Sequence, residues 1–254
     1  MFNISDKVVM ITGATGQIGS VLSSGIAQRG GRVIVCDISK DKGEELVQEI
    51  KDNGGIAEFS LLDVTLPDTI KKTVDKCTKD FGHIDALINN AGVSVMTPFF
   101  ERTSEEVDKV IDVNLKGVLN CSKIVAQEMA KENKGTIINI ASLYGFHSPD
   151  PSIYGDSGRN SSEIYGMTKS GVIQLTKYLA VHLAEYSIRV NCISPGGISN
   201  NQDVTFVKRY SEKTVLGRMA YDSEILGPLI FLLSDASSYV CGHNLIVDGG
   251  YSIF

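Results

Sequence analysis

The sequence predicts an α/β fold, a doubly wound parallel sheet of about seven strands with helices on both faces. Two features of the 254 residues indicate this fold. Short apolar runs typical of buried strands alternate with segments of helical periodicity along nearly the whole chain. The first apolar run also leads directly into a glycine-rich turn at 13–19, which is how a strand joins a helix in doubly wound sheets. We expect one domain over 1–254, since such domains commonly reach this length without dividing.

The first third of the chain alternates strand and helix. Strands are expected at 8–11, 32–36 and 57–62, and helices at 17–28, 40–53 and 67–80. Apolar residues three and four positions apart mark the first helix. Gly54 and Gly55 end the second helix, and Pro67 suits the first turn of the third. A fourth strand, at 84–88, leads into the sequence NNAG at 89–92.

The rest of the chain continues the alternation with one interruption. A long helix is expected at 104–131, with Thr103 or Ser104 as its cap and Glu106 completing a capping box. The fifth strand, 135–141, ends at Ser142; a helix at 163–185, a strand at 188–193, a helix at 222–233 and a strand at 244–247 follow. Residues 145–162 are rich in proline, glycine and serine, which predicts an irregular surface insertion. Residues 199–217 are polar and weakly helical, typical of a loop over a substrate pocket.

Composition limits the partners that the chain can bind. Hydrophobic residues make up 43% and charged residues 21%, as in an ordinary globular protein, and the net charge of −6 argues against nucleic acid. No apolar run approaches the roughly 20 residues that cross a bilayer. The N-terminus enters the first strand without a signal-peptide pattern. The five cysteines are widely spaced with no CxxC pair, so we expect a cytoplasmic protein with reduced cysteines and no metal site.

The turn at 13–19 has the features of a phosphate-binding loop. Gly13 would allow the sharp turn, Gly16 would let a diphosphate approach the backbone, and Gly19 would bring the helix close to the sheet. The helix would offer free N–H groups and the positive end of its dipole to the phosphates. The second strand ends at Asp37, 18 residues after Gly19, near the roughly 20 expected for a carboxylate that binds a ribose 2′-hydroxyl. The alternative is a glycine turn that merely connects strand to helix.

Tyr165 and Lys169 form the most suggestive pair of side chains. They lie four residues apart in a predicted helix, and therefore on one face of it. A neighbouring ammonium group stabilises a phenolate and lowers the pKa of the tyrosine. Such a pair can take a proton from an alcohol or give one to a developing alkoxide. Taken alone, the spacing is more often that of an ordinary helix surface.

Ser142 and Asn114 are two further candidates. Ser142 ends the fifth strand at the edge where open α/β sheets bind ligands, and it could hold a substrate carbonyl toward the tyrosine. The alternative role for Ser142 is to cap a turn. Asn114 is a poor residue for a helix interior, so it would either distort the helix and bind water near Lys169 or be a solvated surface asparagine.

Together these segments resemble the short-chain dehydrogenase/reductase (SDR) family over the whole chain, in the family's order: TGATGQIG at 12–19, Asp63-Val64, NNAG at 89–92, Asn114, Ser142, YGMTK at 165–169, RVNCISPGG at 189–197 and VDGG at 247–250. The resemblance implies a single Rossmann-type domain. It makes Tyr165 the catalytic acid/base and has Lys169 hold the nicotinamide ribose while lowering the tyrosine pKa. It also implies that Ser142 orients the substrate and that Asn114 anchors the water of a proton relay.

The resemblance further implies a set of cofactor contacts: Gly13, Thr15, Gly16, Gln17, Ile18, Gly19, Asp37, Asp63, Val64, Asn90, Ala91, Gly92, Pro195, Gly196 and Ile198, together with Tyr165 and Lys169. NAD is the expected cofactor, because Asp37 would repel the 2′-phosphate of NADP and accept a hydrogen bond from a free 2′-hydroxyl. Thr15 and Ile38 stand where NADP-preferring relatives often carry Arg or Lys. Lys40 is the one nearby cation that opposes this choice.

The chain departs from the family pattern in two places. From Ser142 to Tyr165 there are 23 positions, more than in typical members, so extra residues within 146–161 lie beside the active site and are expected to shape the substrate pocket. The segment after Ile198 lacks the threonine that often contacts the carboxamide. The insertion resembles that of an SDR subgroup associated with bacterial surface-sugar and flagellin-glycan pathways, which implies a sugar nucleotide or amino-sugar substrate. His147 and Arg159 would then meet a hydroxylated or phosphorylated substrate, or else face solvent.

We therefore expect NAD-linked interconversion of a secondary alcohol and a ketone. Two alternatives remain: a non-catalytic nucleotide-binding regulatory protein of the same fold, and a reductase of a small lipid-like or acyl ketone. The resemblance also implies a homo-oligomer, a tetramer or dimer, formed through the helices near 104–131 and 163–186.

Overall fold

All seven strands of the protein lie parallel in one sheet. A computed structural model describes residues 1–253 and orders the strands β3-β2-β1-β4-β5-β6-β7. The strands are β1 (Val8–Thr12), β2 (Arg32–Asp37), β3 (Ile56–Leu61), β4 (Ala86–Asn89), β5 (Gly135–Ile140), β6 (Ile188–Pro195) and β7 (Asn244–Val247). The order reverses between β1 and β4, and ligands of such sheets bind at the carboxyl ends of the strands beside this reversal. The predicted doubly wound fold is confirmed.

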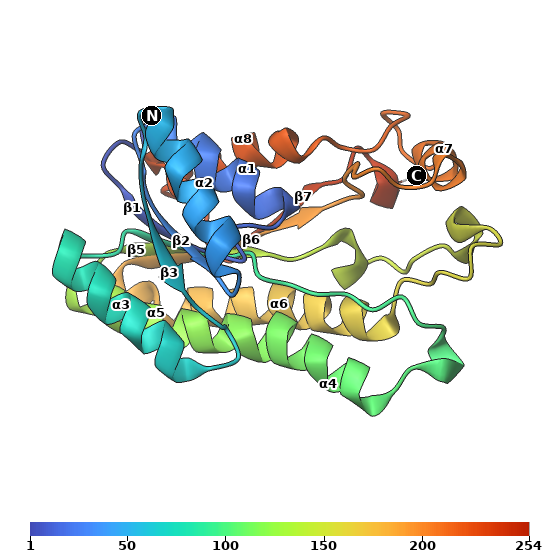
Figure 1. The fold of residues 1–254 in the computed structure, drawn as a ribbon, viewed down its shortest axis with the longest axis horizontal. Helices are drawn as coiled ribbons and strands as arrows, with labels where there is room; N and C mark the ends of the chain where they lie inside the picture. The colour runs from blue at the N-terminus through green and yellow to red at the C-terminus, as the bar shows by residue number, and fades with distance from the viewer. Residues whose placement is uncertain (254) are drawn as a thin grey trace.

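Helices cover both faces of the sheet (Figure 1). One face carries α1 (Gln17–Ala27), α2 (Lys40–Asp52) and α8 (Leu226–Leu233). The other carries α3 (Pro67–Phe81), α5 (Val118–Lys131) and α6 (Glu163–His182), and α4 (Ser104–Ile111) extends beyond them. This double covering explains why the strands are continuous apolar runs rather than alternating ones.

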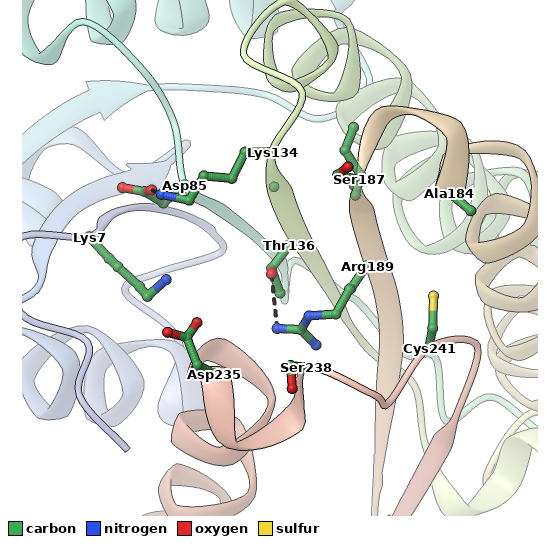
Figure 2. Close-up of a pocket in the computed structure, with 12 residues that line it drawn as sticks. Lys7, Asp85, Lys134, Thr136, Ala184, Ser187, Arg189, Asp235, Ser238 and Cys241 are labelled. Carbon is green, nitrogen blue, oxygen red and sulfur yellow. Dashed lines mark hydrogen bonds and ion pairs between the residues drawn. The ribbon is translucent and has the colours of Figure 1, made fainter. Parts of the chain in front are cut away.

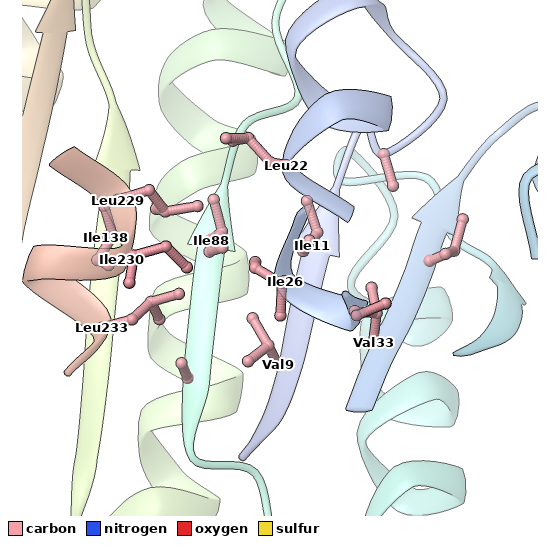
Figure 3. Close-up of a cluster of buried hydrophobic side chains, with 14 of the residues drawn as sticks. Val9, Ile11, Leu22, Ile26, Val33, Ile88, Ile138, Leu229, Ile230 and Leu233 are labelled. Carbon is pink, nitrogen blue, oxygen red and sulfur yellow. The ribbon is translucent and has the colours of Figure 1, made fainter. Parts of the chain in front are cut away.

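Two hydrophobic clusters, one on each face, hold the layers together. Val9 and Ile11 of β1 point to one face, and Val8 and Met10 point to the other. Figure 3 shows side chains of α1 and α8 meeting those of the sheet: Leu22, Ile26, Leu229, Ile230 and Leu233 from the helices, and Val9, Ile11, Val33, Ile88 and Ile138 from the strands. Burying one such side chain stabilises the fold by roughly 1.5–3 kcal/mol.

The predicted helix at 104–131 is not continuous. A π-helical turn over Asp112–Gly117 separates α4 from α5, and Asn114 lies inside it, buried. The helix is therefore distorted at Asn114, as expected, and the idea of a solvated surface asparagine is wrong. The predicted capping box is present: Thr103 caps α4 and accepts from the backbone of Glu106.

The insertion at 145–162 is more ordered than predicted. Short 3₁₀ turns occupy Leu143–Gly145 and Pro151–Tyr154, and Ile153 is fully buried in a third cluster with Tyr210 and Tyr251. The helix α7 (Val204–Ser211) carries Tyr210 and packs against this insertion. The insertion is thus attached to α7 and to the C-terminal segment, while residues 155–159 remain exposed.

Across residues 1–253, no helix combines the length and the apolar character that a membrane span requires. All five cysteines are free thiols, and four of them are buried.

Candidate active site

A cavity of about 610 Å³ lies at the carboxyl ends of β4, β5 and β6, beside the reversal of strand order. Each strand end contributes to it, and α6 supplies the wall that carries Tyr165 and Lys169. The predicted site residues that line this cavity are Gln17, Ile18, Asn90, Gly92, Ser142, Tyr165, Lys169, Pro195, Gly196 and Ile198. The fold therefore brings together residues that are up to 181 positions apart (198 − 17) in the sequence.

The glycine turn is built as predicted at its first two glycines. Gly13 has a φ of +62°, and a Cβ there would lie 2.7 Å from the Cα of Ala91. A Cβ on Gly16 would meet nothing closer than the Gly13 carbonyl oxygen at 3.4 Å, so this side of the turn is open to a diphosphate. Gly19 differs from the prediction: it packs against Gly13 and Ala14 of the turn itself, not against the sheet.

Asn90 and Ala91 fasten this turn to β4. The side-chain amide of Asn90 donates to the carbonyl oxygens of Thr12 at 3.1 Å and of Gly13 at 2.8 Å. The hydroxyl of Thr12 accepts from the backbone N–H groups of Asn90 at 3.1 Å and Ala91 at 3.2 Å. The two loops at the reversal of strand order are thus held as one rigid unit.

Asp37 lies buried at the carboxyl end of β2, next to the glycine turn. One carboxylate oxygen accepts from the backbone N–H of Thr15 at 3.0 Å, and the other accepts from Ser39 at 3.1 Å. Lys40, the cation that opposes NAD, lies 3.8 Å from the Glu44 carboxylate. The negative charge of Asp37 therefore stands beside the turn, where the adenine ribose of a dinucleotide would be expected.

Asp63 and Val64, expected to contact adenine, lie after β3. Like Asp37, they are outside the lining of the cavity. Asp63 accepts from the backbone N–H of Thr65 at 2.8 Å and from its hydroxyl at 2.7 Å. The Val64 side chain is buried against Gly117 of the π-helical turn. An adenine contact by Val64 would thus come from its backbone.

Lys169 is buried next to Tyr165. Its Nζ lies 5.7 Å from the Tyr165 ring centroid and donates to the Ile140 carbonyl oxygen at 2.7 Å. Burial lowers the pKa of Lys169 to about 8. Burial also raises the pKa of Tyr165, and a hydrogen bond with the Ser142 side chain partly offsets this rise. The expected lowering of the tyrosine pKa is therefore not seen, because burial disfavours the charged phenolate more than the contact with Ser142 favours it.

Ser142 lies directly after β5 and is buried. Its Oγ accepts from the backbone N–H of Tyr144 at 3.1 Å, so the turn-capping role is real, and the same side chain faces Tyr165 and lowers the pKa of that residue. The capping bond fixes the orientation of the hydroxyl that faces the tyrosine.

Asn114 joins the loop after β4 to α6, the helix that carries Tyr165 and Lys169. Its Oδ1 accepts from the Val93 N–H at 2.8 Å, and its Nδ2 donates to the Val93 carbonyl at 2.9 Å and to Thr168 of α6 at 3.3 Å. A Cβ on Gly92 would lie 3.5 Å from Asn114 Oδ1 and 3.6 Å from Lys169 Nζ, so both groups lie under this loop. The side chain of Asn114 is thus engaged by protein groups: both N–H bonds of Nδ2 are used, and Oδ1 keeps one acceptor position for the predicted water.

The substrate side of the cavity is formed by the insertion and by the segment around α7. Several of its lining residues were not singled out from the sequence, because they come from segments that the fold alone brings together, among them Ser94, Met96, Tyr144, Tyr154, Phe206 and Tyr210. Arg159 lines the cavity. His147 is outside its lining and packs edge-on against Tyr251, with ring centroids 5.6 Å apart. Of the two alternatives for His147, this position does not support a contact with the substrate.

Residues 198–202 close the cavity near β6. The side chain of Gln202 donates to the Ile198 carbonyl at 2.7 Å and accepts from the Asn200 N–H at 2.6 Å. Gln17 of α1 reaches across and donates to the Ser199 carbonyl at 2.7 Å. The segment that lacks the usual threonine is therefore held by amide side chains.

A second cavity, of about 360 Å³, lies at the opposite, amino-terminal edge of the sheet (Figure 2). Its principal charged groups are bonded to protein atoms. Asp85 accepts from the Val8 N–H at 2.9 Å and from Lys134 at 3.1 Å. Arg189 donates to Thr136 Oγ1 at 3.1 Å and to the Leu232 carbonyl at 2.9 Å. These bonds join the starts of the strands to one another and to the end of α8. The charged groups that form them therefore have a structural role.

Comparisons with known proteins agree with this geometry. The family model described as enoyl-(acyl carrier protein) reductase matches residues 13–252. The 3-oxoacyl-(acyl-carrier-protein) reductase of Thermotoga maritima is 37% identical over 254 residues, which cover 98% of this chain and 99% of the relative.

Two solved structures extend the comparison. A short-chain dehydrogenase of Leptospira borgpetersenii with bound NAD+ is 40% identical, with a TM-score of 0.88, and the match covers 98% of this chain and 94% of that one. A gluconate 5-dehydrogenase of Burkholderia cenocepacia in complex with NADP and tartrate is 29% identical, with a TM-score of 0.92, and the match covers 100% and 98% of the two chains. The chain therefore belongs to the short-chain dehydrogenase/reductase family, as an oxidoreductase that acts on CH–OH groups.

Proposed function

We propose that the chain is an NAD-dependent enzyme that interconverts a secondary alcohol and a ketone, with Tyr165 as its acid/base. The observation that carries this proposal is the convergence of Ser142, Tyr165 and Lys169 on one cavity at the reversal of strand order. A nicotinamide cofactor fits the residues present, because Gly16 is open to a diphosphate and Asp37 stands beside the same turn. When bound, that cofactor supplies or accepts the hydride.

The protein's own part is to hold the substrate oxygen and manage its proton. Ser142 and Tyr165 both line the cavity, and their hydroxyls would both donate to the oxygen of a bound ketone. Because the pKa of Tyr165 is raised, its hydroxyl is protonated at neutral pH, the state that can donate to a developing alkoxide. Lys169 would bind the nicotinamide ribose and support the tyrosine, and the water of the proton relay is proposed to bind beside Lys169 and the backbone around Asn114.

The preference for NAD rests on Asp37. Its carboxylate would accept from a free 2′-hydroxyl and repel a 2′-phosphate. The exposed Ile38 beside it adds no positive charge. Of the two solved relatives, one holds NAD+ and the other NADP, so the local charge at Asp37 is the support for NAD in this chain.

The proposed substrate is a sugar nucleotide or an amino-sugar derivative. Its support is the polar substrate wall, to which Ser94, Tyr154, Arg159, Ser161 and Asn200 contribute. The two segments 145–162 and 199–217 would act as the insertion and the substrate loop of a single catalytic domain. The similarity to an acyl-carrier-protein reductase favours a second candidate, an acyl ketone.

We also propose a homo-oligomer, a dimer or tetramer, formed through α4, α5 and α6. Large apolar side chains are exposed on α5 and α6, among them Leu119, Met167 and Val181, the last at 74%. The five free cysteines support a cytoplasmic location.

A substrate panel tests the proposal. Nucleotide-activated sugars, free keto sugars and an acetoacetyl thioester would be followed by loss of NADH absorbance. Turnover of a sugar derivative supports the first candidate, and turnover of the thioester alone supports the second. A wild-type enzyme that turns over none of these ketones with either NADH or NADPH would contradict the proposed activity.

A further inference from the structure

The charge inside the active-site cavity is opposite to that of the whole chain. The chain has 30 acidic against 24 basic residues. Within residues 1–253, however, the cavity is lined by no aspartate or glutamate and by two cationic side chains, Lys169 and Arg159. Lys169 is 4% exposed and bonded to the Ile140 carbonyl, on the side of the proposed cofactor. Arg159 is therefore the cation available to the substrate.

The guanidinium of Arg159 has no hydrogen-bond or ion-pair partner within residues 1–253. Other arginines near the cavity are engaged. Arg102 bonds the Glu163 carboxylate, Arg209 donates to the Ser152 carbonyl at 2.9 Å, and Arg218 pairs with Glu224 at 2.6 Å. An unpaired guanidinium beside a cavity without carboxylates is a site for an anion.

The backbone holds Arg159 close to the catalytic helix. Ser161 and Ser162, which follow it, are buried, and Ser162 Oγ accepts from the Tyr165 N–H at 3.2 Å as the cap of α6. Three residues span at most about 11 Å, so Arg159 lies within this distance of the cap. On the other side, Arg209 holds the insertion at Ser152. Arg159 is thus carried on a short exposed segment that is fastened at both ends.

We propose that Arg159 binds an anionic group of the substrate, a carboxylate or a phosphate, while Ser142 and Tyr165 hold the reacting oxygen. The proposal rests on the proposed function of the cavity and specifies its substrate class. The planar guanidinium fork matches both oxyanions in a bidentate geometry. Ketones that carry a carboxylate or phosphate, such as keto acids derived from sugars and sugar phosphates, are therefore preferred over neutral ketones of the same shape.

Matched substrate pairs test this. One pair is a keto-aldonic acid and the neutral ketohexose of the same length, and the other is a keto-sugar phosphate and its unphosphorylated form. The wild-type kcat/KM is expected to be higher for the anionic member of at least one pair, which also distinguishes carboxylate from phosphate. Arg159→Gln should lower kcat/KM for that anion by about 10- to 100-fold, mainly through KM. Arg159→Gln should leave kcat/KM for the neutral member unchanged. For the anionic member, kcat/KM of Arg159→Lys should lie between those of the wild type and Arg159→Gln.

Lys208→Gln is the matched control, because it removes a positive charge from α7 outside the cavity lining. This variant should leave kcat/KM unchanged for all four substrates. Higher wild-type activity on the neutral member of both pairs, or an equal loss on both members in Arg159→Gln, would overturn the proposal while the dehydrogenase activity itself stands.

If no ketone were turned over, the proposed function would fail, and the anion site would be judged by binding instead. Calorimetry with tartrate and with inorganic phosphate should then show binding that weakens in Arg159→Gln. Equal binding to both proteins, or none to either, would overturn the anion site.

Discussion

Asp37→Asn offers a quantitative test of cofactor choice. Asparagine keeps the size of the side chain and one acceptor oxygen, so one of the two backbone contacts, to Thr15 or Ser39, can persist. A hydrogen bond to a charged group contributes about 1.5–3 kcal/mol. Because each 1.4 kcal/mol corresponds to tenfold, loss of that charge should lower kcat/KM for NADH by about 10- to 100-fold.

The same substitution should raise kcat/KM for NADPH. A carboxylate and a phosphate about 4 Å apart repel by about 1 kcal/mol in water and about 4 kcal/mol at the effective dielectric near a protein surface. Removal of this repulsion should raise kcat/KM for NADPH by at least about fivefold. Both effects lower the ratio of kcat/KM for NADH to that for NADPH, which is expected to be well above one in the wild type.

The assay is the initial rate of absorbance change at 340 nm with each reduced cofactor at a fixed concentration of one ketone. Asp41→Asn is the control, since it removes one negative charge from the exposed first turn of α2 without touching Asp37, and it should leave the ratio unchanged. A wild-type enzyme faster with NADPH, or a ratio unchanged in Asp37→Asn, would refute the assignment of Asp37.

Three further predictions concern backbone strain and buried polar groups. Gly13→Ala and Gly158→Ala both place a side chain at positive φ, but a Cβ at 13 meets Ala91 Cα at 2.7 Å whereas that at 158 meets nothing within 4 Å. Urea unfolding should therefore show a loss of about 1 kcal/mol at 158 and a clearly larger loss at 13; equal losses would contradict the close approach. The pKa of Lys169 falls from an ordinary 10.5 to about 8, so the folded state binds fewer protons than the unfolded state between these pH values and stability rises with pH there. Lys169→Met should remove this rise and stabilise the fold at pH 7 by up to about 3 kcal/mol; a destabilised variant would argue against burial of the ammonium group. Within residues 1–253 the Tyr251 hydroxyl is buried without a hydrogen-bond partner, so Tyr251→Phe should leave the free energy of unfolding unchanged or raise it by about 1 kcal/mol, and a loss of that size would show that the hydroxyl has a partner.

Sequence patterns correctly predicted the features of this structure that depend on residues close together in the chain. The glycine turn, the strand that ends at Asp37 and the capping box at Thr103 each depend on residues close together in the chain. The pairing of Tyr165 with Lys169 depends on helical spacing alone. The order of alternating strands and helices then places all of them at one edge of a parallel sheet.

Other features depend on contacts between distant segments. His147 is near the active site in sequence, yet its ring turns to Tyr251 near the C-terminus. The aromatic wall joins Tyr154 of the insertion to Phe206 of α7, with ring centroids 5.5 Å apart, and no spacing in the sequence signals this contact. The direction of the Tyr165 pKa shift was wrong for the same reason, since it depends on burial by the whole site.

In the proposed mechanism, Tyr165 transfers the proton while the rest of the site binds the cofactor. The most direct measurement compares wild type and Tyr165→Phe for NADH binding, by NADH fluorescence, and for turnover of one ketone. Phenylalanine preserves the ring beside Lys169 and removes only the hydroxyl proposed to carry the proton. NADH binding is expected to persist in Tyr165→Phe, and kcat is expected to fall by at least about 100-fold. Turnover that remains near the wild-type rate would contradict the proposed mechanism.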